Sequence, residues 1–157
     1  MIKIDISSLG TVIIQNIVLD FNGTIANDGK LDDILRSKIL KLHELGFKIY
    51  IITADTNETV KDEIKDLPVK IRILNPGDEE KEKLKILESI GAENSFVMGN
   101  GRNDILMVKK AKIGVGVIGE EGISGKLMSV CDIIVTSPMD GLDLLLKPNR
   151  LKATLRV

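Results

Sequence analysis

The sequence predicts an α/β fold with a mainly parallel sheet. Short apolar segments alternate along the chain with longer segments whose apolar residues recur every three or four positions, as buried strands and amphipathic helices do. The chain has 157 residues, of which 43% are hydrophobic and 29% are charged, and this is the size and balance of one globular domain. We therefore expect a single domain over residues 1–157, with an N-terminal hairpin at 1–14, a core at 16–146 and a C-terminal tail at 147–157.

The first elements are a hairpin and a buried strand. Residues 2–6 alternate in polarity, a Ser-Ser-Leu-Gly turn follows at 7–10, and the strand-forming residues TVII follow at 11–14, which together are typical of a β-hairpin. Residues 16–20 then form an apolar run that ends in Asp20. A run of this kind indicates a parallel strand that is covered on both faces.

The rest of the chain continues the alternation. A helix is expected over 31–45, because one face is apolar: Leu31, Ile34, Leu35, Ile39, Leu42 and Leu45. The same patterns predict further strands at 47–52, 69–74, 95–98, 113–118 and 133–136, and further helices at 57–66, 79–90, 104–111, 123–129 and 139–146. The C-terminal sequence LKATLRV alternates in polarity, so we expect it, like the hairpin, to form an edge or interface segment.

Composition excludes several classes of function. The 22 basic and 23 acidic residues give a net charge of −1, and aromatic residues make up only 3%, so neither phosphate-backbone attraction nor base stacking favours a nucleic-acid partner. The single cysteine, Cys131, and the single histidine, His43, exclude a disulfide framework and a multi-histidine metal centre within one chain. No apolar run reaches the length of a membrane span, and the N-terminus lacks the apolar region of a signal peptide, so we expect a cytoplasmic protein.

The polar residues that follow the predicted strands are suited to phosphoryl transfer. Ligands of such sheets bind at the carboxyl ends of the strands, where Asp20, Thr53 and the 99–104 loop lie. Asp20 would attack phosphorus, Thr53 would donate a hydrogen bond to the phosphoryl group, and Lys83 would neutralise its charge. Asp20 and Asp104 would together hold Mg²⁺.

Four segments in this order resemble the motifs of the haloacid dehalogenase-like (HAD) superfamily: DFNGT at 20–24, IITAD at 51–55, Lys83, and GNGRND at 99–104. The stretch from 99 to 117 also resembles a motif of P-type ATPases, so the most similar group is the soluble P-type ATPase-like group of small HAD proteins. The resemblance covers residues 16 to about 146. It implies a capless, Rossmann-like three-layer sandwich and a Mg²⁺-dependent phosphohydrolase or ATPase that forms an aspartyl-phosphate.

The resemblance also assigns residues to roles, which we write as expectations. It implies catalytic roles for Asp20, Asn22, Thr53 and Lys83. It implies phosphate binding by a set of backbone and side-chain groups: Gly23, Thr24, Thr53, Ala54, Lys83 and Asn103. It implies Mg²⁺ binding by a set of oxygen ligands: Asp20, Asn22, Asn100 and Asp104.

Two of these positions depart from the pattern of HAD phosphatases. Asn22 stands where most of them carry the Asp that protonates the leaving group and then activates water, and an amide can do neither. This predicts substrates with good leaving groups, or slow dephosphorylation. Asn100 replaces another Asp, so the site has one negative charge fewer and we expect weaker metal binding.

Two alternatives follow from these residues. A HAD scaffold with catalysis weakened by Asn22 and Asn100 could act as a phosphate-ligand-binding or regulatory protein. A receiver domain of two-component signalling also uses Asp, Thr and Lys, but it carries its phosphorylated Asp after the third strand of its sheet. The Asp20 strand is the first sheet strand after the hairpin here, so the receiver alternative is disfavoured.

The spacing between the motifs predicts an open site. Asp20 and Thr53 are 33 positions apart, and Thr53 and Lys83 are 30 apart, which leaves no room for a cap domain. We therefore expect a large substrate such as a phosphoprotein, a lid from another subunit of a homo-oligomer, or low specificity toward small phosphate esters and anhydrides.

Overall fold

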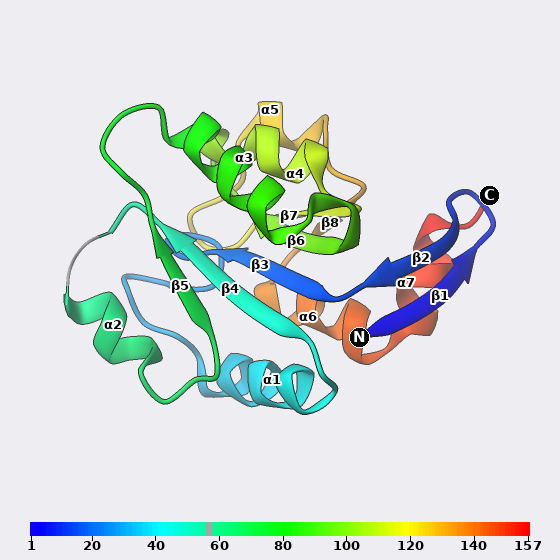
Figure 1. Cartoon of the computed structure of the whole chain (residues 1–157), viewed down its shortest axis with the longest axis horizontal. Coiled ribbons are helices and arrows are strands. Elements are labelled where there is room, and N and C mark those ends of the chain that lie inside the picture. The colour runs from blue at the N-terminus through cyan, green and yellow to red at the C-terminus, as the bar shows by residue number, and fades with distance from the viewer. Residues whose placement is uncertain (56–57) are drawn as a thin grey trace.

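The computed structural model describes residues 1–55 and 58–157. Its centre is a parallel sheet of six strands, which lie in the order β5-β4-β3-β6-β7-β8 (Figure 1). The strands are β3 (Asn16–Asp20), β4 (Lys48–Thr53), β5 (Lys70–Ile73), β6 (Ser95–Gly99), β7 (Ile113–Val117) and β8 (Ile133–Val135). The predicted α/β fold with a mainly parallel sheet is confirmed.

The strand order places a switch point at the middle of the sheet. The chain runs outward from β3 through β4 to β5, and then returns to the other side of β3 to build β6, β7 and β8. Helices that leave β3 and β6 therefore diverge to opposite sides, and the crevice between the carboxyl ends of these two strands is where ligands of such sheets bind. Asp20 and Gly99 are the last residues of β3 and β6.

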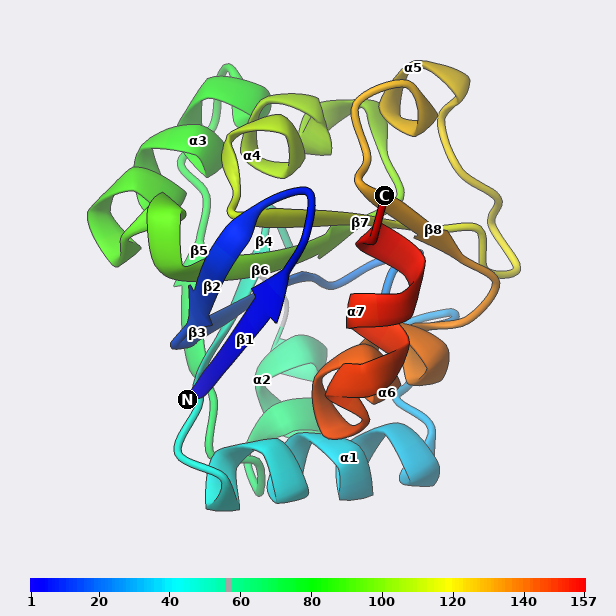
Figure 2. The ribbon, with the colours of Figure 1, turned by 90° about the vertical axis from the view of Figure 1, so that its right-hand side faces the viewer.

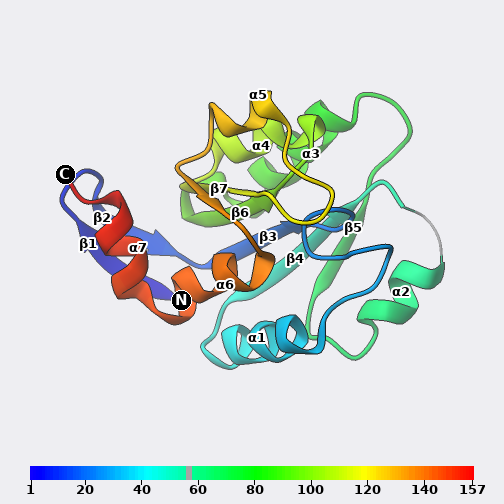
Figure 3. The ribbon, with the colours of Figure 1, turned by 180° about the vertical axis from the view of Figure 1, so that it is seen from behind.

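Helices cover both faces of the sheet and complete three layers (Figures 1 and 3). On one face, α1 (Asp33–Glu44) packs beside α6 (Pro138–Leu146), and on the other α3 (Glu79–Ile90) packs beside α4 (Ile105–Lys110) and the short α5 (Gly125–Met128). The core is correspondingly divided into two apolar clusters, one on each face. Helix α2 (Glu58–Ile64) follows β4, and position 57 of the helix predicted there lies outside the described residues.

Helix boundaries differ from the predicted ones where capping residues intervene. Asp32 accepts a hydrogen bond from the N–H of Ile34 at 2.7 Å and caps α1, so the helix begins two residues later than predicted. Ile34 and Leu45 remain 61% and 57% exposed, whereas the other four residues of the predicted apolar face are buried: Leu31, Leu35, Ile39 and Leu42. Helix α5 is shorter than predicted, and a 3₁₀ turn at Arg102–Asp104 precedes α4.

The N-terminal hairpin is present, but the C-terminal segment is helical. Strands β1 (Ile2–Ile6) and β2 (Gly10–Ile14) pair antiparallel in a sheet of their own. Residues Pro148–Leu155 form helix α7, which packs on β1 and buries Leu151 (Figure 2). The prediction of an edge strand at LKATLRV is therefore wrong, because the helix that begins at Pro148 continues through it, and an interface role for this segment stays a prediction.

The two residues that composition singled out take no part in the site. His43 is exposed on α1, as a surface histidine is. The Cys131 thiol is half-buried, and its hydrogen bond goes to the carbonyl of Leu127. Burial raises its pKa to about 11, which disfavours the nucleophilic thiolate form. No helix within the described part of the chain is long and apolar enough to cross a bilayer.

Candidate active site

Three strands bring their last residues together at one edge of the sheet. Asp20 ends β3, Thr53 ends the neighbouring β4, and Gly99 ends β6 on the other side. Both polar side chains are buried, with Asp20 8% and Thr53 2% exposed. The rule that carboxyl ends of parallel strands meet at one edge therefore places the predicted nucleophile between the two other motifs.

Helix α3 positions the Lys83 side chain next to Asp20. Lys83 lies one turn before Leu87, so both side chains point from α3 toward the sheet and are buried. The Lys83 ammonium contacts Asp20 Oδ1 at 2.7 Å and Asp104 Oδ1 at 2.6 Å. Lys81 and Lys85 are exposed, so α3 itself distinguishes the site lysine from its neighbours.

Asp104 anchors the loop that follows β6. Its second oxygen, Oδ2, accepts hydrogen bonds from the N–H groups of Asn100 and Gly101, at 3.0 and 2.9 Å. The backbone at Gly99 packs directly on the Asp104 side chain, and a Cβ at that position would lie 2.6 Å from the carboxyl carbon. Glycine is therefore required at 99, and Asp104 is wholly buried, with Lys83 as its counter-ion.

The loop after β3 places Thr24 against the same carboxylate. The Thr24 hydroxyl lies 2.8 Å from Asp20 Oδ2 and 3.1 Å from Asn100 Oδ1, and shares its proton between them. The N–H of Gly23 donates to Ala26, and the N–H of Thr24 donates to Phe21. Both amides are thus engaged within the loop, and phosphate binding by these two residues stays a prediction.

The remaining predicted residues surround Asp20 at the open side. Thr53 Oγ1 accepts a hydrogen bond from the N–H of Asp55 at 3.0 Å, which fixes the turn that presents Ala54. Asn103 accepts a hydrogen bond from Lys83 at 3.4 Å. Its amide nitrogen donates to Glu79 at 2.7 Å, so Asn103 links the lysine to the start of α3.

These groups line a cavity of about 340 Å³. Its walls carry most of the residues that the sequence singled out: Asp20, Asn22, Thr53, Ala54, Lys83, Asn100 and Asn103. Gly101, Glu79 and Glu121 line it as well, and sequence reasoning missed all three. Their positions in the sequence could have indicated the two glutamates, since Glu79 lies at the start of α3 and Glu121 follows β7, the strand next to β6.

The charges at the site are mutually dependent. Burial, together with the nearby Asp104 carboxylate, raises the pKa of Asp20 to about 6, although Lys83 and Thr24 act in the opposite direction. For Lys83, burial opposes the charged form, but the two carboxylates outweigh burial and raise its pKa. Lys83 therefore stays an ammonium ion that holds two acidic groups close together.

The site offers oxygen ligands to a hard cation. Asp20 and Asp104 converge on the ammonium position of Lys83, and the Asn100 side-chain oxygen shares a hydroxyl donor with Asp20. Within 1–55 and 58–157, no three His, Cys, Asp or Glu side chains form a metal site. A bound ion would therefore depend on two carboxylates, an amide oxygen and water, and this set fits Mg²⁺.

Comparison with known proteins gives relatives from one organism, Methanocaldococcus jannaschii. The uncharacterized protein MJ0073 of Methanocaldococcus jannaschii is 49% identical to this chain over 84 residues, which are 51% of this chain and 90% of that protein. This chain belongs to the MJ0073 family. No family model matches the sequence.

The fold of this MJ0073 family member is that of HAD phosphatases. The 3-deoxy-D-manno-octulosonate 8-phosphate phosphatase of Moraxella catarrhalis, solved with magnesium, phosphate and KDO, superimposes with a TM-score of 0.72 at 19% identity and covers 89% of this chain and 90% of its own. A HAD superfamily (subfamily III A) hydrolase of Legionella pneumophila gives a TM-score of 0.71 at 15% identity, over 90% and 87% of the two chains. At such identities the likeness concerns the fold.

Proposed function

We propose that this protein is a Mg²⁺-dependent phosphohydrolase that works through an aspartyl-phosphate on Asp20. The observation that carries the proposal is the buried carboxylate at the switch point of the sheet, held by Lys83 at 2.7 Å and by Thr24 at 2.8 Å. A carboxylate held in this way is oriented for attack, and the lysine that holds it is placed to accept the charge of a phosphoryl group.

Each residue has a defined part in the proposed reaction. Asp20 attacks phosphorus and the bond to the leaving group breaks. Thr53, Ala54 and Asn103 line the cavity around Asp20, where their polar groups contact the oxygens of the phosphoryl group. Lys83 is shared between Asp20 and Asp104 and neutralises the charge that the phosphoryl group brings.

The metal would be held by Asp20, Asn100 and Asp104. Mg²⁺ bound there supplies positive charge to the phosphate oxygens, which the protein donors complement. The Moraxella phosphatase was solved with magnesium and phosphate, which supports the choice of ion. Asn22 also lines the cavity, and its exposed side chain adds a further amide oxygen on the side of the cavity that opens to solvent.

The substrate class we propose is a small phosphate ester or anhydride. The phosphatase from Moraxella is named for a sugar-acid phosphate, and the cavity of about 340 Å³ is open and of a size for a small molecule. The likeness to P-type ATPases rests on the sequence at 99–117 alone, so we propose no preference for ATP and no coupling to ion transport.

Phosphatase assays on the wild type and the Asp20→Asn variant test the proposal. With p-nitrophenyl phosphate, acetyl phosphate and ATP in the presence of Mg²⁺, the wild type should turn over at least one substrate, and Asp20→Asn should reduce the rate at least 10³-fold. The matched control is Asp66→Asn, an exposed aspartate remote from the cavity, which should keep the wild-type rate.

Acid-quenched samples should also carry a phosphoryl group that is stable in acid and released in alkali, and Asp20→Asn should carry none. Equal background rates for the wild type and Asp20→Asn would contradict the proposal. Phosphate binding without turnover would then favour the regulatory alternative, in which Asn22 and Asn100 have weakened catalysis.

A further inference from the structure

The loop after β7 is the part of the site that the proposed function leaves unused. Its sequence, IGEEGIS at 118–124, is rich in glycine, but it is not a P-loop, because no Gly-Lys-Ser/Thr follows. Gly119 and Gly122 adopt the left-handed region, with φ of +54° and +77°, so the chain turns sharply on either side of two glutamates. Figure 3 shows this loop beside the segment that follows β3.

Contacts with both motif loops fix the turn. A Cβ on Gly119 would lie 3.3 Å from the carbonyl oxygen of Gly23, so the two backbones pack closely there. The Asn100 side chain donates to the carbonyl of Gly122 at 3.2 Å, and the N–H of Ser124 donates to the carbonyl of Asn100 at 2.8 Å. The loop is thus held by the two segments that carry Asp20 and the metal ligands.

The fixed turn directs Glu121 into the catalytic cavity. The Glu121 carboxylate lines that cavity with Asp20 and Asn22, and its Oε2 lies against Gly23 so closely that a Cβ there would overlap it. Glycine at 23 therefore makes room for a carboxylate beside the backbone of Asn22. Among the described residues, no hydrogen bond or ion pair engages Glu121, whereas Glu79, the other glutamate of the cavity, accepts a hydrogen bond from Asn103.

We propose that Glu121 is the proton donor and acceptor that Asn22 cannot be. The inference rests on the proposed function. In the first step, the Asp20 oxygen bonds to phosphorus, the bond from phosphorus to the ester oxygen breaks, and the Glu121 carboxyl gives its proton to that oxygen. In the second step, Glu121 takes a proton from water as the water oxygen bonds to phosphorus, and the bond to Asp20 breaks to release phosphate.

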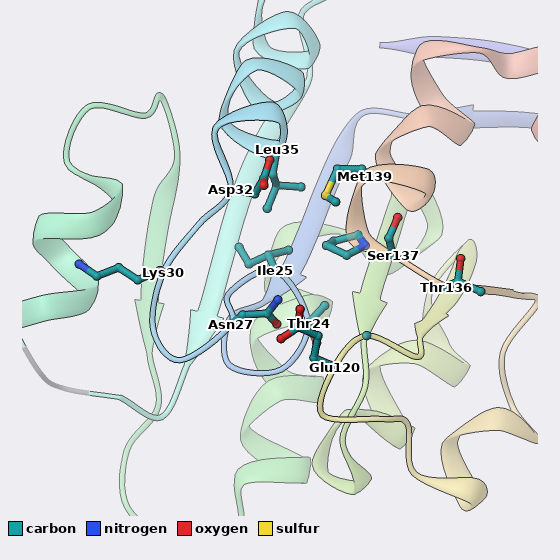
Figure 4. A pocket seen from close by; sticks show the side chains of 12 residues that line it. Thr24, Ile25, Asn27, Lys30, Asp32, Leu35, Glu120, Thr136, Ser137 and Met139 are labelled. Carbon is teal, nitrogen blue, oxygen red and sulfur yellow. The ribbon is translucent and has the colours of Figure 1, made fainter.

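The adjacent glutamate provides a matched control. Glu120 lies on the same turn, but it lines a separate pocket with Thr24 and Asn27, as Figure 4 shows, and does not line the catalytic cavity. Replacing either glutamate by glutamine removes one ionisable carboxyl group from the same exposed turn. Only the change at Glu121 removes an acid from the cavity.

The test compares substrates whose leaving groups do or do not need a proton. With Glu121→Gln, we expect kcat toward an alkyl phosphate such as glycerol 3-phosphate to fall about 10²-fold or more, because general acid catalysis is worth about 10²–10⁴-fold. With p-nitrophenyl phosphate the first step needs no proton, so phosphorylation of Asp20, followed as the burst of nitrophenol, should keep its rate. Glu120→Gln should match the wild type with both substrates.

A second substitution shows whether Glu121→Gln loses activity through lost chemistry or through misfolding, because a misfolded protein could not be rescued by a new acid. Asn22→Asp restores an acid beside Asp20, so it should restore alkyl phosphate hydrolysis in the Glu121→Gln background. The inference would be overturned by equal losses in the rate of Asp20 phosphorylation with both substrates, by no rescue from Asn22→Asp, or by a raised Mg²⁺ requirement in Glu121→Gln, since that would make Glu121 a metal ligand. If the wild type turned over none of the substrates faster than Asp20→Asn does, that result would instead contradict the proposed function itself.

Discussion

Lys83 is the residue on which the electrostatic balance of the site depends. Its ammonium group is buried and pairs with two buried carboxylates, Asp20 and Asp104. Removal of one partner from such a group leaves uncompensated charge, which typically costs about 3–5 kcal/mol. We expect Lys83→Met to lower the free energy of unfolding by about that amount at pH 7.5, measured by urea denaturation, and to abolish the phosphatase activity proposed above.

The exposed Lys85 on the same helix is the control for this prediction. Lys85→Met should change the free energy of unfolding by no more than about 0.5 kcal/mol, as is usual for surface positions. The deficit of Lys83→Met should shrink as the pH falls below 6, because protonation of Asp20 removes its repulsion with Asp104. A deficit that is independent of pH would indicate lost packing rather than lost charge.

The raised pKa of Asp20 makes the stability of the folded protein depend on pH. The pKa rises from 3.8 to about 6 because burial and Asp104 disfavour the ionised form. A group whose pKa is higher in the folded state contributes stability below its unfolded pKa and loses it as the pH rises. Without added Mg²⁺, the wild type should therefore lose stability between pH 4 and pH 6, and Asp20→Asn should lack this part of the slope. Identical pH profiles for both proteins would contradict the assignment.

At the scale of elements, contact between α4 and β7 depends on a glycine. A Cβ at Gly114 in β7 would overlap the backbone carbonyl of Val108 in α4 and would lie 2.8 Å from that residue's side chain. Backbone cannot yield as a flexible side chain can, so the helix and the strand must separate. We expect Gly114→Ala to lower the free energy of unfolding by about 1–3 kcal/mol, measured by urea denaturation.

Gly125, the first residue of α5, has open space where a Cβ would stand. Gly125→Ala should be neutral or should stabilise by up to about 1 kcal/mol, because alanine restricts the unfolded chain. If Gly114→Ala and Gly125→Ala changed the free energy of unfolding equally, the close packing at Gly114 would contribute nothing to stability.

At the scale of the whole molecule, the site links three segments that are far apart in sequence. Asp20, Lys83 and the 99–104 loop meet only when the sheet is complete, so a ligand that binds all three stabilises the entire fold. Beryllofluoride with Mg²⁺ mimics an acyl phosphate on Asp20. At 100 times its Kd it should stabilise by about 2.7 kcal/mol.

In a protein of this size, that corresponds to a rise in Tm of roughly 5–10 °C, measurable by differential scanning fluorimetry. Asp20→Asn should show no rise beyond that caused by Mg²⁺ alone. A full response in Asp20→Asn would place the acceptor elsewhere and would contradict the assignment of Asp20.

The sequence by itself determined the order of the strands along the chain and the residues at their ends. Asp20 and Thr53 could be assigned to one edge of a sheet because apolar runs mark buried strands and parallel strands end together. Residue chemistry also indicated Lys83 and Asp104, and the resemblance added Asn100. The structure brings all five into one cluster around the cavity.

Tertiary structure alone decided which groups face one another across the cavity. Glu121 reaches it because the 118–124 turn packs on Gly23 and Asn100, and helix α7 forms where the hairpin gives Leu151 a surface to pack on. Local patterns encode which residues are buried, since burial repeats with the period of a helix or strand. Contacts between loops depend on the path of the whole chain, and no local pattern carries that information.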